Sequence, residues 1–506
     1  MFYRTAMFHD KIQDSHVSFN TSALLRGLLL LGLLGCQQLT PAESGEDHPG
    51  VVQWLAGDHH VHSHYSVRWD QTVFPPQPIL GGDAKYSIPL NAQMAASFGL
   101  SWLVVTDHGG PNRAQLALEQ AYPELLASRQ ALPQILQFYG MEFDVPGLSP
   151  GGRHASLIMP MRPNEAQQLY DIERQFNGRQ GVPPGPEKAE DAIMLKALQA
   201  MNQLADKPLL LANHPSRLAT GFRQYEKITP KQLRDWQDTA PDVVIGMTGA
   251  EGHQAAVFNP DGSLKPDGIR GEYPHYPTHG GYDQMTAQLG GVWDSLLSEG
   301  RSWWVTGVSD SHGHYTDGGA DFWPGQYAKT YVLAEKNYHS IFAALKAGKI
   351  FVTTGDLIDV LDIEVAVAGA AQGAGAGATL RVQDSDELVL RIRFRDPDRR
   401  NGGGFNPQVA RVDLILGEIT GKSADPHHDQ ALKTQVAKRW YAADWQQQNG
   451  YSVLEWPLGR AHQSQYVRLR GTNQRDELEP LPDLKGENPW HDLWFYSNPI
   501  FIEVLP

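Results

Sequence analysis

The chain has 506 residues, of which 41% are hydrophobic and 20% charged, so it can bury a sizeable core, and its length suggests two to three domains. This composition excludes wholesale disorder, collagen and coiled coils. The 42 basic and 57 acidic residues give a net charge of −15. That charge argues against nucleic acid as a specific partner, because the phosphate backbone has the same sign. A cationic metal site could still attract an anionic substrate locally.

The N-terminal region contains the only cysteine, Cys36, directly after an apolar run at 27–35 that is too short to cross a bilayer. The run is typical of a signal-peptide core, and residues 33–36 (LLGC) resemble a bacterial lipobox. We therefore expect residues 1–35 to be a lipoprotein signal peptide, Cys36 to be lipidated and residues 36–50 to be a polar tether. The alternative is a buried apolar strand at the N-terminus of a cytosolic protein.

Lipidation would attach the protein to the membrane of a bacterial cell envelope. The expected location is the outer membrane or the periplasmic face. The residue after the cysteine is Gln37, where retention at the inner membrane typically has Asp, and this favours the outer membrane.

Between residues 51 and 355, strand-like runs alternate with helical patterns, which predicts an α/β domain. The strands are continuous apolar runs, as expected of parallel strands buried on both faces, at 102–106, 135–139, 155–159, 209–212, 243–247 and 303–308. Helices are expected at 89–98, 188–205, 228–238, 283–299 and 338–348.

After Gly355 the pattern changes to short strand-like segments, several of them alternating between apolar and polar residues. They lie at 357–367, 378–383, 387–395, 408–416, 465–471 and 498–504. Few helical signals occur among them. Residues 356–506 are therefore predicted to form a smaller all-β, sandwich-like C-terminal domain.

Histidines and carboxylates recur at the expected strand ends. His60 and His62 are two residues apart, so on an extended segment their imidazoles share one face. Other candidate ligands follow four of the strands: His108 after Asp107, then Glu142, His214, and Asp310 with His312. In a parallel α/β barrel the carboxyl ends of all strands share one face, so these side chains are expected to converge. Histidine and carboxylate without cysteine suit Zn, Mn or Fe.

These segments resemble the PHP (polymerase and histidinol phosphatase) superfamily. The matching pieces occur in the family's order: 58–63 (DHHVHS), 106–108 (TDH), 140–142 (GME), His154, 213–215 (NHP) and 309–312 (SDSH). The resemblance implies a distorted (β/α)7 barrel over residues 51–355, with two or three divalent metal ions at its C-terminal face. His154 is included only through the resemblance, because it stands near the start of its own strand.

The resemblance also implies a role for each matching residue. The first metal would be held by His60, His62, Glu142 and Asp310, and Glu142 would bridge to a second metal held by His154 and His214. The third would be held by His108, His312 and an acidic residue. Here the family pattern is interrupted by an apparent insertion at 67–82. Asp83 restores the family's spacing, while Asp70 and His64 are rivals for the same position.

The resemblance implies a metal-dependent hydrolase with Glu142, Asp310 and His214 as catalytic residues. The first expectation is a phosphoesterase that uses a hydroxide held between the first two metals, because clustered divalent ions lower the pKa of bound water. The alternatives are a carboxylic or carbamic ester hydrolase with the same centre, and a non-catalytic envelope lipoprotein whose metals only stabilise the fold.

The expected partner is a small, anionic ester. Arg153, Arg217 and His253 are the candidate substrate-binding residues, since an arginine beside a ligand can bind an anionic group. Residues 325–355 resemble the end of the CehA/McbA branch of the superfamily, which includes hydrolases of aryl carbamate esters. Asp107 is expected to orient a neighbouring ligand rather than bind metal.

Overall fold

The computed structural model describes residues 50–110, 113–145, 154–176 and 187–505 of the chain. The predicted signal peptide and Cys36 lie outside the described residues, so the lipid anchor stays a prediction. Residues 50–506 form one compact unit. Among the described residues, no helix is both long enough and apolar enough to cross a membrane.

The unit is built on a 15-stranded mixed sheet, accompanied by a four-stranded antiparallel sheet and a two-stranded hairpin. The section of the large sheet nearest the candidate site contains β1 (Gln53–Val61), β4 (Trp102–Val105), β5 (Leu136–Asp144), β6 (His154–Ile158), β7 (Leu209–Asn213), β8 (Val244–Ala250) and β9 (Trp304–Gly307). These strands are almost entirely buried, which explains the continuous apolar runs in the sequence.

The pairing of these strands differs from the prediction at one place. Strands β1, β4 and β5 pair in parallel, and so do β7, β8 and β9. Strand β6 is antiparallel to both of its neighbours, β5 and β7. A parallel bridge between Val61 and Ser311 brings the segment after β9 beside the end of β1. The expectation that all six strands are parallel was therefore wrong for β6, while closure into a barrel stays a prediction.

Four of the predicted helices are found near their predicted positions, and some of them follow a residue that caps the helix. Ser87 caps α1 (Ile88–Ser97) by accepting a hydrogen bond from the backbone of Leu90. Thr229 and Gln232 form a capping box at α6 (Pro230–Thr239). The other two long helices that were predicted are α5 (Glu187–Gln203) and α9 (Tyr338–Lys346).

The helices also include departures from the prediction. The segment 283–299 contains two helices, α7 (Gln284–Ala287) and α8 (Val292–Ser298), because Gly290 adopts a left-handed φ of 68° between them. The prediction also lacked three helices: α2 (Arg113–Leu116), α3 (Tyr122–Ala131) and α4 (Glu165–Phe176).

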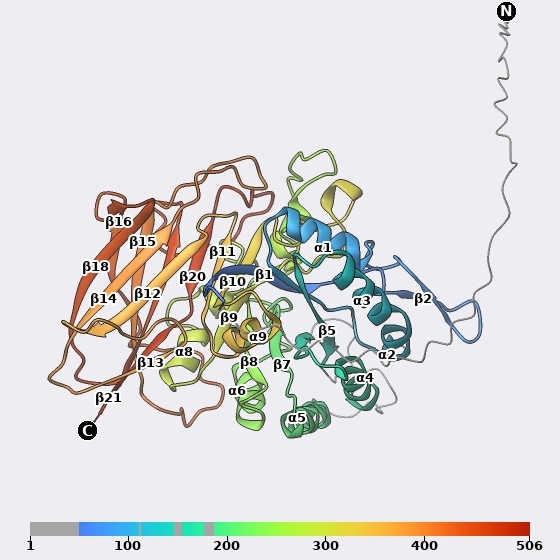
Figure 1. Cartoon of the computed structure of the whole chain (residues 1–506), viewed down its shortest axis with the longest axis horizontal. Helices are drawn as coiled ribbons and strands as arrows, with labels where there is room; N and C mark the ends of the chain where they lie inside the picture. The colour runs from blue at the N-terminus through green and yellow to red at the C-terminus, as the bar shows by residue number, and fades with distance from the viewer. Residues whose placement is uncertain (1–49, 111–112, 146–153, 177–186, 506) are drawn as a thin grey trace, which may run out of the picture. The chain divides into compact units, whose positions relative to one another are not determined.

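The elements described between residues 356 and 505 are all strands. Four of them form the separate antiparallel sheet: β12 (Val360–Val367), β14 (Glu387–Arg395), β18 (Tyr451–Arg460) and β17 (Gln446–Gln448). Figure 1 shows β12, β14 and β18 grouped with the other orange and red strands, apart from the helices α1 to α5. Packing of this part as a sandwich stays a prediction.

The large sheet continues through the predicted domain boundary at 355/356. Strand β1 pairs with β10 (Ala328–Ala334), β10 pairs with β11 (Ile350–Thr354), and β11 pairs with β20 (Trp494–Ser497). The sheet then extends to the C-terminal strands β19 (Gln465–Thr472) and β21 (Ile500–Val504). Strands from both sides of the boundary thus share hydrogen bonds and one buried core.

Candidate metal centre

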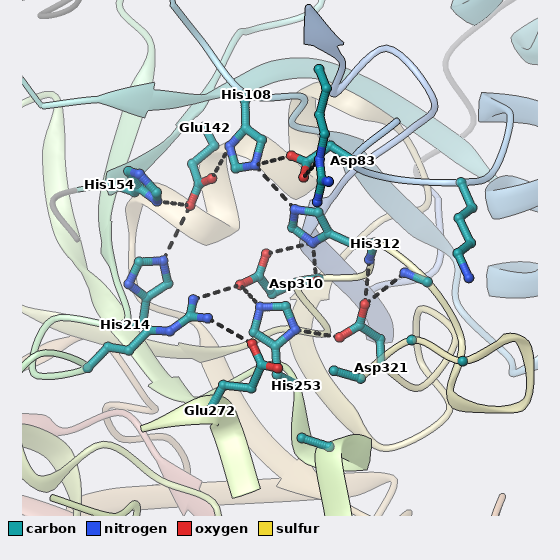
Figure 2. Close-up of a pocket in the computed structure, with 18 of the residues that line it drawn as sticks. Asp83, His108, Glu142, His154, His214, His253, Glu272, Asp310, His312 and Asp321 are labelled. Carbon is teal, nitrogen blue, oxygen red and sulfur yellow. Dashed lines mark hydrogen bonds and ion pairs between the residues drawn. The ribbon is translucent and has the colours of Figure 1, made fainter. Parts of the chain in front are cut away.

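The structure brings all nine predicted metal ligands together. Seven of them line a cleft of about 860 Å³, and Figure 2 shows their side chains pointing toward one another: Asp83, His108, Glu142, His154, His214, Asp310 and His312. His60 and His62 lie beneath them and are completely buried. The cleft thus lies at the ends of β1, β4, β7 and β9 and within β5 and β6.

Glu142 is the centre of this cluster. Its Oε1 lies 2.9 Å from Nδ1 of His154 and 3.1 Å from Nε2 of His60, and its Oε2 lies 2.7 Å from Nδ1 of His108. The nearest nitrogen of His214 is 3.4 Å from Oε1. Burial by itself raises the pKa of the carboxyl group, but the charges of His154 and His60 hold it well below its usual value. One ionised carboxylate therefore contacts four imidazoles within 3.4 Å, and a fifth ring, that of His62, lies 3.6 Å from it.

Asp310 closes the deep side of the cluster. Its Oδ1 lies 3.2 Å from Nε2 of both His60 and His62, and those two nitrogens are 3.0 Å apart. Asp310 has a left-handed φ of 48° on the segment that follows β9. Gly252 makes this placement possible, because a Cβ at that position would lie only 2.3 Å from the Cβ of Asp310.

Of the three candidates for the position beside His108 and His312, only one lies near these two histidines. Nε2 of His108 lies 3.2 Å from Oδ2 of Asp83 and 3.2 Å from Nε2 of His312. Asp70, on the hairpin of β2 (Arg68–Asp70) and β3 (Gln77–Ile79), instead accepts hydrogen bonds from Thr72. His64 contacts Glu124. Asp83 is thus the candidate that reaches the cluster.

His154 reaches the cluster because β6 is antiparallel. Reversal of the strand places its first residue at the edge where β5 and β7 end, and His154 pairs in register with Asp144 and Asn213. Its Nδ1 faces Glu142 and its Nε2 lies 3.2 Å from Oδ1 of Asp144. Burial lowers the pKa of His154, but the two carboxylates outweigh it and raise the value to about 10.

Hydrogen bonds determine which ring nitrogen of His62 is free. The Ser66 hydroxyl donates to Oδ1 of Asp107, so it accepts a hydrogen bond from Nδ1–H of His62, with the two atoms 2.9 Å apart. Nε2 of His62 then has a free lone pair directed at the cluster. Asp107 thus orients His62 through Ser66, and such an arrangement is typical of the groups behind a metal ligand.

A hydrogen bond also determines which ring nitrogen of His312 is free. Its Nδ1 lies 2.9 Å from the carbonyl oxygen of Asp310, which can only accept a hydrogen bond, so Nε2 again has the lone pair. His214 is buried, and neither of its ring nitrogens has a hydrogen-bond partner among the described residues. Burial, opposed by Glu142, lowers the pKa of His214 to about 4, so its ring is neutral at pH 7.

These donors fit divalent metal ions. Three groups made up of predicted ligands alone have ligand atoms within 4.8 Å of one another: His62, His108 and His312; His60, His62 and Glu142; and Glu142, His154 and His214. A fourth group in the cleft combines His312 with His253 and Asp321. Buried imidazole nitrogens with free lone pairs and ionised carboxylates are the ligands that Zn, Mn and Fe accept. The protein thus has several buried groups of histidine and carboxylate that could hold metal ions.

The cleft also contains a pair formed by His253 and Asp321, of which the sequence predicted only His253. His253, a predicted substrate-binding residue, lies between two carboxylates, with Nε2 at 2.9 Å from Asp310 and Nδ1 at 2.5 Å from Asp321. The other oxygen of Asp321 accepts hydrogen bonds from the backbone of His312 and Gly313. No sequence signal pointed to Asp321, because it lies in a loop with Gly318 and Gly319 and does not directly follow a strand.

Of the two arginines that were predicted to bind substrate, only Arg217 belongs to the described residues. Arg217 lines the cleft, with one guanidinium nitrogen 3.7 Å from Asp310 and another 3.3 Å from Glu272. Arg153 lies outside the described residues, so its role stays a prediction.

A separate acidic group, formed by Asp483, Glu487 and Asp492, surrounds a buried guanidinium rather than an open site. Arg270 lies 3.2 Å from Asp483 and 3.0 Å from Glu487, and its side chain is fully buried. The arginine neutralises these carboxylates, so the group is a structural contact between residue 270 and the C-terminal segment.

A scan against protein-family models finds no matching family, and a search of curated proteins finds no matching relative. The resemblance to the PHP superfamily therefore depends on the sequence motifs and on the cluster that their residues form.

Proposed function

We propose that the protein is a metal-dependent hydrolase of the PHP superfamily that acts on phosphoesters. The observation that carries the proposal is the position of Glu142, a buried carboxylate in contact with four imidazoles from separate elements. Such a carboxylate is suited to bridge two metal ions. We further propose that β1 and β4 to β9 form the distorted (β/α)7 barrel of that superfamily, with the Val61–Ser311 bridge as part of its closure.

The protein would hold two or three divalent ions of Zn, Mn or Fe. Bound there, the ions would lower the pKa of a coordinated water toward neutrality and neutralise charge on the phosphoryl oxygens. Glu142 and Asp310 would contribute charged ligands to the ions, and His214 would contribute a neutral imidazole. His62 and His312 are already oriented by Ser66 and by the Asp310 carbonyl, which reduces the reorganisation needed for binding.

The lining of the cleft supports a phosphoester over an aryl ester. Among the described lining residues, none is Phe, Tyr or Trp, so an aryl group would find no aromatic wall. Four cationic side chains line the cleft instead: Arg68, Lys85, Arg217 and Lys265. A compact anionic substrate matches this lining better than a flat apolar one.

The test uses the purified protein, stripped with a chelator and reloaded separately with Zn, Mn or Fe. We expect metal-dependent hydrolysis of 4-nitrophenyl phosphate or its bis ester, and slower hydrolysis of 4-nitrophenyl acetate. Faster turnover of the acetate would support the carboxylic ester alternative. Metal-loaded protein that hydrolyses none of the three would favour the non-catalytic lipoprotein and overturn the proposal.

We also propose that Cys36 anchors the protein to the envelope membrane, where it meets a small soluble ester. Fractionation of cells that express the full chain tests this, with Cys36→Ser as the variant. We expect the wild-type protein in the membrane fraction and a signal-peptide precursor or soluble form for the variant. Equal fractionation of both would argue against lipidation.

A further inference from the structure

Two lysines in the cleft have no carboxylate partner among the described residues. Nζ of Lys85 lies 2.5 Å from the backbone carbonyl of Asp317, and Nζ of Lys265 lies 3.3 Å from the backbone carbonyl of Ala256. Within the described part of the chain, neither ammonium forms an ion pair. A carbonyl oxygen satisfies one of the three donors of an ammonium group and leaves its charge uncompensated.

The two arginines of the cleft differ from these lysines. Arg68 lies 3.7 Å from Asp83, and Arg217 lies close to Glu272 and Asp310. Their charges are thus at least partly compensated by carboxylates of the protein. Among the described cationic side chains of the cleft, the two lysines are therefore the ones whose charge is available to bind an anionic ligand.

Metal binding would change the net charge of the cleft from negative to positive. The cleft is lined by five carboxylates and four cationic side chains, a balance of one negative charge when its histidines are neutral. Two divalent ions would change that balance to three positive charges. A site with this charge in a concave surface concentrates anions.

The lysines flank the cluster on different segments. The backbone of Lys85 donates to the carbonyl of His312, and its stem packs beside Gly313, where a Cβ would lie 3.3 Å from Cδ of the lysine. Lys265 contacts Ala256, three residues after His253. Both ammonium groups therefore line the same cleft as the metal ligands but belong to its walls rather than to the cluster.

We propose that the natural substrate has a second anionic group, and that Lys85 and Lys265 bind it while the metal cluster holds the reacting phosphoryl group. This inference rests on the proposed phosphoesterase function. The substrate is then a small, non-aromatic phosphoester whose leaving group has a phosphate or a carboxylate. Its body is polar, because the apolar side chains that line the cleft are limited to Leu218 and two alanines.

The experiment measures kcat and KM of the metal-loaded full chain on three matched substrates. Glycerol phosphate has one anionic group, 3-phosphoglycerate adds a carboxylate, and glycerol bisphosphate adds a phosphate. We expect kcat/KM to be about tenfold higher for at least one of the two doubly anionic substrates, through a lower KM. The substrate that is favoured tells whether the second group is a carboxylate or a phosphate.

The variants Lys85→Gln and Lys265→Gln are expected to raise KM for the favoured substrate about tenfold, and to affect glycerol phosphate several times less. Lys85→Arg keeps the charge and is expected to keep most of the preference. Lys422→Gln is the matched control, because this exposed lysine pairs with Asp238 away from the cleft and is expected to change neither constant.

Two results would overturn the inference while leaving the proposed function intact. One is equal kcat/KM for all three substrates in the wild-type protein. The other is an equal loss on singly and doubly anionic substrates in the lysine variants. Failure to hydrolyse any phosphoester, including the 4-nitrophenyl compounds, would instead reject the proposed function and the inference together.

Discussion

At the scale of single residues, hydrogen bonds within the protein already orient two histidines of the candidate metal centre. Ser66 and Asp107 orient His62, and the Asp310 carbonyl orients His312. Each of these bonds leaves the lone pair of the ring directed into the cluster. The arrangement explains how histidines that are far apart in sequence can present nitrogens at separations of 3.0 and 3.2 Å.

Glu142→Gln tests the carboxylate that is proposed to bridge two metal ions. The amide keeps the size of the side chain but removes the charge that faces four imidazoles. We expect bound metal to fall by at least one ion per chain and turnover to fall by about 10³-fold, consistent with loss of a metal-site charge. Elemental analysis and kcat on 4-nitrophenyl phosphate measure the two effects.

Glu455→Gln is the control for this substitution, because Glu455 lies on an exposed part of β18. It is expected to keep full activity and metal content. A Glu142→Gln protein that retains normal metal content and turnover would show that the carboxylate is not part of a working centre.

Asp321→Asn tests the residue that sequence analysis missed. Both carboxylate oxygens of Asp321 accept hydrogen bonds, one from His253 and one from the backbone of His312 and Gly313. The amide nitrogen of asparagine would face a donor at one of these places. We expect kcat to fall about tenfold with bound metal unchanged, because the asparagine oxygen can keep the bonds from the backbone of His312 and Gly313 while His253 loses its charged partner.

The measurement for Asp321→Asn compares kcat, KM and metal content in the same preparation. Asp261→Asn is a suitable control, since Asp261 is exposed and bonds only to Ser263 among the described residues. Loss of metal in parallel with kcat would instead mean that Asp321 supports ligand binding itself.

At the scale of elements, the site depends on how strand ends and loops approach one another. The reversal of β6 places His154 opposite Asp144 and beside Asn213. If β6 were parallel to its neighbours, His154 would lie at the end of the sheet where β5 and β7 begin, far from the cluster. Gly252 likewise allows the segment after β8 to pack against Asp310.

Gly252→Ala tests this close approach. The added Cβ would lie 2.3 Å from the Cβ of Asp310 and 2.5 Å from the carbonyl oxygen of Ser309, so the Asp310 segment must move. We expect turnover to fall at least about tenfold and the free energy of unfolding to fall by about 1–3 kcal/mol. Urea denaturation and kcat on 4-nitrophenyl phosphate measure the two effects.

Gly375→Ala is the matched control. A Cβ at this position would lie 3.4 Å from its nearest neighbour, the carbonyl oxygen of Ile363 on β12, and the φ of Gly375 is not left-handed. The substitution is expected to change the free energy of unfolding by less than about 1 kcal/mol. An alanine at 252 that is tolerated as well as this one would contradict the packing described for Asp310.

At the scale of the whole molecule, residues 50–506 behave structurally as one unit. The large sheet joins the α/β part to the C-terminal strands through the pairing of β11 with β20. Buried ion pairs reinforce this connection, among them Arg270 with Asp483 and Arg468 with Asp294. The C-terminal strands therefore support the sheet whose opposite section holds the candidate centre.

Arg270→Met tests the strength of the connection. Removal of the guanidinium leaves Asp483 and its neighbouring carboxylates buried without a countercharge. We expect the free energy of unfolding to fall by about 3–5 kcal/mol in a urea titration. Arg460→Met is the control, since its pair with Glu387 is exposed on both sides and is expected to contribute about 1 kcal/mol or less. Similar losses in the two variants would contradict this account of Arg270.

Much of the site was predictable from the sequence. His60, His62, Glu142, His214, Asp310 and His312 lie in the last residues of strands or shortly after them, and local periodicity is enough to show roughly where such strands end. The same periodicity located most of the long helices and the change to strands after residue 355. Weakly apolar helices such as α3, and strand β18, were missed because their local patterns are ambiguous.

Only the tertiary structure decided the remaining features. In the structure β6 runs antiparallel to its neighbours, and this direction brings His154 to the cluster. Asp83, rather than Asp70 or His64, lies beside His108. Asp321, which the sequence did not indicate, contacts the backbone of His312. One sheet also continues across the predicted domain boundary. The physical reason is that strand direction, pairing partner and hydrogen-bond acceptor depend on residues tens to hundreds of positions away, whereas periodicity and spacing record only the local chain.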